Sequence, residues 1–312
     1  MVHCLRELGG HHTVEDFSDH KGCYVTPIST TYRGYEVFQI PPNNQGITAL
    51  LLLNILEQFS LLDMDPMGPE RLHLEIEAAR LAYADRDALI GDVSADRLIN
   101  ELLSKDYAKD RSRLIDLGSA GKGSHPGAPH GSDTVYLCVV DKDRNAVSLI
   151  SSIFHTFGSG VVVPSTGVLL QNRGAGFRLK DGHPNCIGPS KRPLHTIMPG
   201  MVYKADTMVM PMGVMGGDYQ PTGNAHVLSN IIDFGCDIQE ALDLPRIFYE
   251  KGIVQVERGI AANVQNSLTS RGHKLEQVVE ALGGGHGIWV DNESGVMTAG
   301  TDPRLDGCAI GY

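Results

Sequence analysis

Residues 132–152, SDTVYLCVVDKDRNAVSLISS, decide how this chain is interpreted. The segment directly before them, residues 118–132, reads GSAGKGSHPGAPHGS and has the composition of a loop. The stretch itself predicts two strands, Thr134–Val140 and Ala146–Ser152, joined by a polar turn. Cleavage before Thr134 would place a hydroxyl nucleophile and a free α-amine on one residue, which is a complete nucleophile and base.

The glycine-, serine-, proline- and histidine-rich loop of residues 118–132 has two interpretations. One is a flexible linker between two domains. The other is a processing segment that is exposed and mobile so that it can be cut. Both require the same composition, so these residues alone leave both open.

Composition describes an ordinary globular protein. The chain has 312 residues, 42% hydrophobic and 20% charged, enough for one large domain or two smaller ones. A net charge of -11 disfavours a general binder of nucleic acid or anionic membranes. The longest apolar run, Ala49–Leu56, is far too short to span a membrane, and the N-terminus shows no signal peptide.

Cysteines and histidines give no metal prediction. The six cysteines form no CxxC pair, and the thirteen histidines form no HExxH pattern. We therefore expect neither a metal nor another cofactor. The cysteine pattern favours a reducing compartment, and we expect a cytoplasmic protein.

The flanking regions mix helices and strands without regular alternation. The expected strands are 25–28, 35–40, 208–214, 254–257, 288–290 and 296–298, with further short strands around the glycines of residues 157–172. The expected helices are 46–59, 70–89, 100–115, 224–234, 238–242 and 261–271. This order favours an α+β fold in which two sheet layers have helices outside.

Two elements carry more detailed expectations. In the helix of residues 70–89, the charged side chains Glu75, Glu77, Arg80 and Asp85 are expected mostly off the apolar stripe. The hairpin of residues 134–152 looks apolar on both faces, as in a sheet that is covered on both sides.

Candidate chemistry outside the hairpin is sparse. Gly216 and Gly217 lie between a strand and a helix, where backbone N–H groups can bind an anion, although a plain tight turn is the commoner explanation. His155 and His195 each lie beside a glycine- or proline-rich turn and are candidates for lining a site. The turn Asp302–Asp306 is expected to pair charges for structural reasons. These residues alone leave open whether the protein is an enzyme.

Several ordered motifs resemble the gamma-glutamyltranspeptidase family of N-terminal-nucleophile (Ntn) hydrolases. They are ISTTYRGYEVFQIPPNNQGITALLLLNILEQF (28–59), EAARLAYADRDALIGD (77–92), TVYLCVVDKDRNAVSLISS (134–152), FGSGVVVPSTGVLLQN (157–172), GPSKRPLHTIMP (188–199), the MGG turn (215–217) and TDPRLDGCAIGY (301–312). The resemblance implies a four-layer αββα Ntn-hydrolase fold. It also implies a precursor that cuts itself into a large-subunit part, residues 1–133, and a small subunit, residues 134–312, which stay together as one domain.

The resemblance assigns roles to four residues. Thr134 is the nucleophile, and its own α-amine, with a pKa near ~7.7–8, takes the proton. Gly216 and Gly217 bind the oxyanion, and Ser152 hydrogen-bonds the nucleophile. No cofactor or metal is implied.

The positions that recognise a glutamyl group in the family differ here. Phe154 replaces an asparagine, Gly176 replaces the aspartate that binds the substrate α-amine, and His195-Thr196 replaces a serine pair. An ammonium group that is buried without a partner costs several kcal/mol. The pattern is more similar to the non-glutamyl branch of the family, which includes cephalosporin-acylase-like proteins and oxamate amidohydrolase.

A small amide is therefore the expected substrate. Arg173, His155 and His195 are expected to contact an anion or an amide, with further polar contacts from Asp218 and Gln220. Two alternatives stay open: a true gamma-glutamyl transferase or hydrolase with a rearranged pocket, and an inactive, uncleaved remnant that serves as an interaction or storage module.

The resemblance also concerns what lies before residue 1. The family precursor is longer, so the chain is expected to begin inside the large subunit and to lack its N-terminal part. That part normally supplies an arginine for the substrate carboxylate and would carry any signal peptide. A homodimer of processed heterodimers is one expected assembly.

Overall fold

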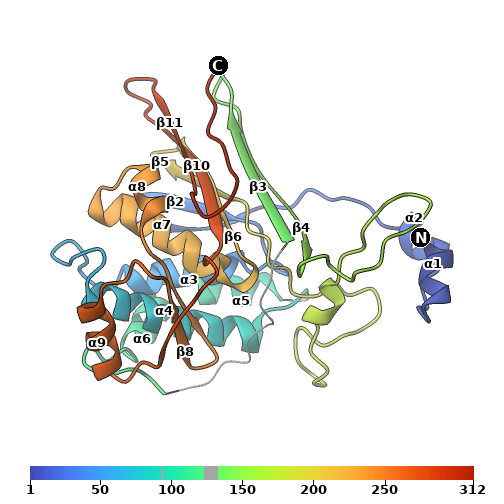
Figure 1. Ribbon diagram of the computed structural model, residues 1–312, viewed down its shortest axis with the longest axis horizontal. Helices are drawn as coiled ribbons and strands as arrows, with labels where there is room; N and C mark the ends of the chain where they lie inside the picture. Colours follow the sequence, from blue (N-terminus) through green and yellow to red (C-terminus); the bar gives the residue numbers. More distant parts are fainter. Residues whose placement is uncertain (93, 123–132) are drawn as a thin grey trace.

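The computed structural model describes residues 1–92, 94–122 and 133–312, and its centre is a six-stranded antiparallel sheet (Figure 1). The strand order is β1-β2-β5-β6-β10-β11. The strands are β1 (Ile28–Tyr32), β2 (Tyr35–Gln39), β5 (Gly200–Lys204), β6 (Thr207–Met215), β10 (Gly284–Val290) and β11 (Met297–Thr301). Segments from both sides of residue 133 thus share one sheet.

Two smaller sheets accompany it. One is the hairpin of β3 (Asp133–Val140) and β4 (Ala146–Phe154). The other consists of β7 (Ile247–Glu250), β8 (Ile253–Val256) and β9 (Leu275–Gln277), with β8 and β9 parallel. The hairpin contacts β6 and β10, so it lies against the central sheet.

The helices of the described residues lie outside the sheets (Figure 1). They are α1 (Val2–Glu7), α2 (Val14–Ser18), α3 (Gly46–Leu56), α4 (Pro69–Leu89), α5 (Asp96–Leu102), α6 (Lys105–Ser112), α7 (Gln220–Phe234), α8 (Ile238–Asp243) and α9 (Ala262–Ser270), with short 3-10 turns η1 (Arg173–Gly176) and η2 (Gly217–Tyr219). None of them combines the length and apolarity that a membrane crossing needs.

Two neighbouring residues of β6 show that the central sheet is covered on both faces. A Cβ at Gly213 would lie 2.4 Å from the ring of Tyr136, which belongs to the hairpin. A Cβ at Gly223 of α7 would lie 2.7 Å from Val214. Because successive residues of a strand point to opposite faces, the hairpin covers one face and α7 the other.

The core helix α3 is the most deeply buried element. All of its residues are buried, and Leu50, Leu52 and Leu53 have no exposed surface. The expected helix of residues 46–59 is confirmed, although it ends at Leu56 rather than Phe59.

In α4 the expectation for the charged residues is wrong. Glu75, Glu77, Arg80 and Asp85 are all buried, with exposed fractions between 0% and 9%. The helix is packed on all sides, and each charge has a partner. Glu75 pairs with Arg71, Glu77 with Arg80, and Asp85 with Arg111. Pairing lets the helix bury these groups, which a stripe of apolar residues does not reveal.

The hairpin β3–β4 forms as expected, but its burial differs from the prediction. Tyr136 and Ile150 are buried against Met215 of β6. The opposite face is exposed in the structure and consists of Val135, Leu137, Val139, Val147 and Leu149, which are 43–66% exposed. Only one of the two apolar faces of the hairpin is therefore buried.

Other expectations need smaller corrections. The strand expected at residues 25–28 is wrong, since β1 covers Ile28–Tyr32 and shares only Ile28 with it. The helix of residues 100–115 is two helices, because Ser104 caps the start of α6 by accepting a hydrogen bond from the Tyr107 N–H at 3.2 Å. In place of short strands, residues 157–172 contain one isolated bridge between Val162 and Leu169.

The remaining elements are confirmed. The strands of residues 35–40, 208–214, 254–257, 288–290 and 296–298 and the helices of residues 70–89, 224–234, 238–242 and 261–271 form within a few residues of their expected ends. The Asp302–Asp306 turn also pairs charges, since Asp302 binds both Arg246 and Arg304.

We predict that Leu53→Ala lowers the free energy of unfolding by about 2–5 kcal/mol, because it leaves a cavity in the wholly buried helix α3. Urea denaturation measures the change. Leu62→Ala is the matched control, since Leu62 is 75% exposed and its truncation should change stability by less than about 0.5 kcal/mol. Equal losses in the two variants would contradict the assignment of α3 to the core.

Candidate active site

Thr134 lies at the start of β3, directly opposite Ser152 of β4. Its Oγ1 donates a hydrogen bond to Ser152 Oγ over 3.0 Å. Ser152 Oγ also accepts from the backbone N–H of Phe154 at 3.0 Å. The strand register shifts between Asp133 and Thr134, so the ladder is irregular at this point. A pairing of two hydroxyls at an irregular strand end is therefore present where the sequence predicted the nucleophile.

Phe154 ends β4 in an unusual conformation. Its φ is +81°, a left-handed backbone that bulky residues rarely adopt, and its side chain is buried. The ring stacks on His155 with 4.1 Å between centroids. His155 is held by Asn172, whose Oδ1 accepts from the His155 backbone N–H at 3.1 Å. The strained turn brings an aromatic pair to the end of the strand that carries Ser152.

Arg173 lies beside this pair and is 3% exposed. Its guanidinium carbon is 5.0 Å from the centre of the Phe154 ring, and its Nη1 donates to Thr196 Oγ1 over 2.9 Å. Burial lowers the pKa of Arg173 to about 10. The group is still a cation at neutral pH.

His195 is the other predicted histidine of this region. Burial, with a smaller contribution from the charge of Arg173, lowers the pKa of His195 to about 3, so the ring is neutral at pH 7. Its backbone N–H donates to the carbonyl of Asn43 at 2.8 Å, and its carbonyl accepts from the Gln45 N–H at 2.9 Å. His195 therefore lies in a segment that is tied to the region before α3.

Gly216 and Gly217 form the turn between β6 and η2 with φ values of +120° and +59°. A Cβ at Gly216 would lie 2.9 Å from Gly283 Cα, so a side chain there needs the backbone to shift. Glycine is required both for conformation and for space.

Two buried polar side chains, Gln45 and Arg86, hold this turn in place; together they are called the brace. Gln45 Nε2 donates to the carbonyls of Gly217 and Thr196, each at 2.9 Å. Arg86 Nη1 donates to Gln45 Oε1 and to Asp218 Oδ1, each at 2.7 Å. The brace fixes the glycine turn relative to the segment of Thr196.

Two residues that were expected to make polar substrate contacts are instead buried or engaged by the brace. Asp218 directs its carboxylate to the buried Arg86, and Gln220, the first residue of α7, has no exposed surface. Both lie behind the glycine turn. The sequence analysis missed Gln45 and Arg86. The only signal for Gln45 was its position before a mostly apolar helix, and the only signal for Arg86 was its position within a buried one.

Gly176 completes the set of predicted positions. It is half-buried at the end of η1, and its carbonyl accepts from Asn185 Nδ2 at 2.8 Å. A Cβ there would lie 3.3 Å from the carbonyl oxygen of Leu194, beside His195. One series of hydrogen bonds and ring contacts thus joins Thr134, Ser152, Phe154, Arg173, Thr196, Gln45 and Gly217.

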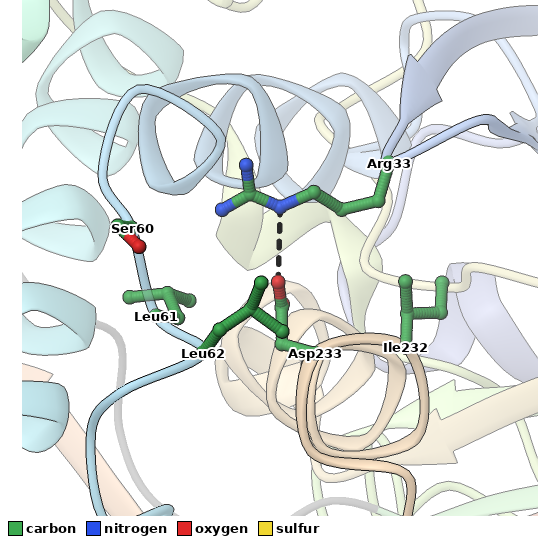
Figure 2. Close-up of a pocket in the computed structure, with 6 residues that line it drawn as sticks. All are labelled: Arg33, Ser60, Leu61, Leu62, Ile232 and Asp233. Carbon is green, nitrogen blue, oxygen red and sulfur yellow. Dashed lines mark hydrogen bonds and ion pairs between the residues drawn. The ribbon is translucent and has the colours of Figure 1, made fainter.

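A pocket of about 200 Å³ lies elsewhere, between the β1–β2 turn, the segment after α3 and α7 (Figure 2). Figure 2 shows Arg33 and Asp233 pointing toward each other across it, joined by an ion pair of 2.9 Å. None of the predicted site residues lines this pocket. Across the described ranges, no group of three or more histidine, cysteine, aspartate or glutamate side chains is placed to hold a metal.

Comparison with protein-family models gives a match over the whole chain. The family model for gamma-glutamyltranspeptidase matches residues 1–312. The chain belongs to the gamma-glutamyltranspeptidase family. The motifs that carry the resemblance include the β3–β4 hairpin and the Gly216–Gly217 turn.

Three relatives illustrate the range of the family. A glutathione hydrolase-like proenzyme of Bacillus subtilis, YwrD, is 38% identical over 100% of this chain and 60% of its own length. Oxamate amidohydrolase proenzyme of Klebsiella pneumoniae is 34% identical over 99% and 59%. The crystal structure of cephalosporin acylase from Bacillus halodurans is 41% identical, with a TM-score of 0.89 over 99% of this chain and 57% of that one. The chain thus spans about 60% of the length of these curated relatives.

We predict that His195 makes stability depend on pH. The unfolded chain protonates this histidine as the pH falls below about 6.5, but the folded protein does so only near 3. Its contribution to stability is therefore full above pH 6.5 and is lost progressively between pH 6.5 and pH 3. His195→Asn should lose less stability than the wild type between pH 7 and pH 4.5, by on the order of 2 kcal/mol.

Urea denaturation at the two pH values measures this difference. The other titrating groups are present in both proteins, so their contributions cancel in the comparison. Equal losses in wild type and variant would show that His195 is protonated as readily in the folded protein as in the unfolded chain.

Proposed function

We propose that the protein is an autoprocessing Ntn amidohydrolase with Thr134 as its nucleophile. The observation that carries the proposal is the 3.0 Å hydrogen bond between Thr134 and Ser152, at the end of a strand whose hairpin packs on β6. β6 leads directly into Gly216 and Gly217. The proenzyme names of the relatives support a precursor that is cut.

Processing starts from the intact bond between Asp133 and Thr134. Thr134 Oγ1 attacks the carbonyl carbon of Asp133, the peptide nitrogen leaves as the new α-amine, and an ester remains. Water then hydrolyses the ester, which releases the Asp133 carboxylate and restores the hydroxyl. Ser152 orients the hydroxyl through the hydrogen bond that it accepts.

Turnover of a substrate repeats this chemistry with the new amine as base. The α-amine takes the hydroxyl proton, Oγ1 attacks the amide carbonyl, and the proton passes to the leaving amine. The backbone N–H groups of Gly216 and Gly217 are proposed to stabilise the oxyanion, and losing one such donor typically costs about 10²–10³ in rate. Water, or an acceptor amine, then releases the acyl group.

The fold of the complete protein is proposed to be the four-layer αββα arrangement. In the described residues, α7 packs on one face of the six-stranded sheet and the β3–β4 hairpin packs on the other. Residues 1–133 and 134–312 are proposed to stay together after cleavage as large-subunit and small-subunit parts. The hydrogen bonds of Gln45 and Asn43 to the segment of His195 join the two parts.

The substrate is proposed not to be glutamyl. Phe154, Gly176 and His195 provide no carboxylate for a substrate ammonium, and the cation Arg173 lies next to Phe154 and Thr196. A glutamyl α-ammonium there would face a like charge. The second candidate is a gamma-glutamyl hydrolase or transferase, which the name of the Bacillus subtilis relative supports.

We predict that purified wild-type protein is cleaved into two polypeptides, residues 1–133 and 134–312, while Thr134→Ala stays one polypeptide of 33.7 kDa. The alanine variant lacks the attacking hydroxyl. Intact-mass spectrometry over long incubation measures this. Thr134→Ser is the matched control and should still cleave, because it keeps the hydroxyl. A wild type that stays intact would support the inactive alternative and contradict the proposal.

We predict that the processed protein hydrolyses small amides such as oxamate with a kcat/KM at least about tenfold above that for gamma-glutamyl-p-nitroanilide. The reason is the missing partner for the glutamyl ammonium, since a hydrogen bond to a charged group contributes about 1.5–3 kcal/mol. Ammonia and p-nitroaniline release measure the two rates. Comparable rates would rule out the changed specificity and favour the glutamyl alternative.

A further inference from the structure

Arg173 is a buried cation that uses only part of its hydrogen-bonding capacity. Nη1 donates to Thr196 Oγ1, but Nε and Nη2 are buried and have no hydrogen-bond partner among the described residues. Leaving charged donors buried and unpaired costs several kcal/mol. A buried polar group of this kind calls for an explanation, and a ligand that completes it is one.

The other buried arginines of the described residues show how unusual this is. Each of the four is paired with a carboxylate: Arg71 with Glu75, Arg80 with Glu77, Arg86 with Asp218, and Arg246 with Asp302. Arg173 pairs with no carboxylate in the parts of the chain that the structure describes. This fold therefore supplies a counter-charge wherever it buries a guanidinium, except next to Phe154.

Among the described residues, the surroundings of Arg173 provide no negative charge. Its neighbours are the face of the Phe154 ring, the hydroxyl of Thr196 and His195, which burial and the charge of Arg173 keep neutral. The two unused donors, Nε and Nη2, are the pair with which a guanidinium can bind a carboxylate in a bidentate manner.

We propose that Arg173 is the binding site for a carboxylate on the acyl group of the substrate. This rests on the proposed function, and it places a carboxylate beside the cation that would repel the α-ammonium of a glutamyl group. The substrate is then a monoamide of a dicarboxylic acid. Its amide carbonyl is attacked by the nucleophile, and its free carboxylate binds Arg173. Side chains next to the guanidinium, such as His195, are half-buried, so a ligand reaches it after local side-chain movement.

The strand β4 links the nucleophile to Arg173. Ser152 contacts the nucleophile, and Phe154, two residues along β4, contacts Arg173. The test therefore uses monoamides of short dicarboxylic acids of different length, from oxamate to glutaramate.

Kinetics on matched amides test the assignment. We compare glutaramate, butyramide and 4-aminobutyramide, which carry a carboxylate, no charge and an ammonium, and add oxamate for the shortest acyl group. The wild type should prefer the better of the two carboxylates over butyramide by roughly 10- to 100-fold in kcat/KM, because hydrogen bonds to charged groups are lost with the carboxylate. 4-Aminobutyramide should be the poorest substrate.

Arg173→Gln should abolish this preference while butyramide hydrolysis continues, and Arg173→Lys should restore part of it. Arg178→Gln is the matched control. Arg178 lies five residues along the same segment, is 34% exposed and faces Asp87 at 3.7 Å, so its loss should leave the preference unchanged. A preference that survives in Arg173→Gln would overturn the proposal, as would a wild type that favours butyramide or 4-aminobutyramide over both carboxylates.

A binding measurement keeps this test separate from the proposed function. Glutarate and oxalate, titrated in a thermal-shift assay, should raise the Tm of the wild type and leave Arg173→Gln unchanged. Without ligand, Arg173→Gln should melt no lower than the wild type, because it removes an unpaired buried charge. If no amide is hydrolysed but the Arg173-dependent shift occurs, the amidohydrolase proposal fails and the carboxylate site stands. If neither dicarboxylate shifts the wild type, the carboxylate site fails.

Discussion

The hydrogen bonds of Gln45 are the interaction on which the arrangement of the site depends. One amide group, fully buried before α3, donates to the carbonyls of Thr196 and Gly217 and accepts from Arg86. These bonds connect the region before residue 133 with two separate segments after it. The loop with Thr196 supports Arg173, and the turn with Gly217 is the proposed oxyanion site. Both would lose their relative position if the amide were absent.

The buried arginines of the described chain pair with carboxylates, with the exception of Arg173. The paired arginines on α4 and at the Asp302 turn stabilise the packing of helices against sheets, and removing one partner would leave an uncompensated ion. Arg173 breaks the rule within the same contact network as Thr134. Because every other buried guanidinium of the described chain has a carboxylate, the exception is better explained by a ligand than by loose packing.

The sequence predicted most elements and the positions of the proposed nucleophile and glycine turn. Strong local signals account for the elements, such as an apolar run for α3 and a glycine stop for α7. The proposed nucleophile and glycine turn were assigned from the resemblance to the family. It did not predict the burial of the α4 charges, because that burial depends on how the other elements pack around the helix. Glu75 and Glu77 have partners one turn away on α4 itself, and only Asp85 pairs with another element, through Arg111. It also missed Gln45 and Arg86, whose partners lie more than a hundred residues away or in another helix.

The position of Thr134 in the β3–β4 ladder is compatible with the proposed cleavage, because a cut there leaves most contacts of the hairpin intact. Thr134 is opposite Ser152, and the residues that follow it continue the pairing to Val140. A cut before Thr134 removes only the pairing of Asp133 with Phe154 from the hairpin. Tyr136 stays against Gly213 of the central sheet, and the hydrogen bonds of Gln45 still join the two pieces. The chain can therefore gain a free amine at the proposed nucleophile without losing the contacts that hold the site.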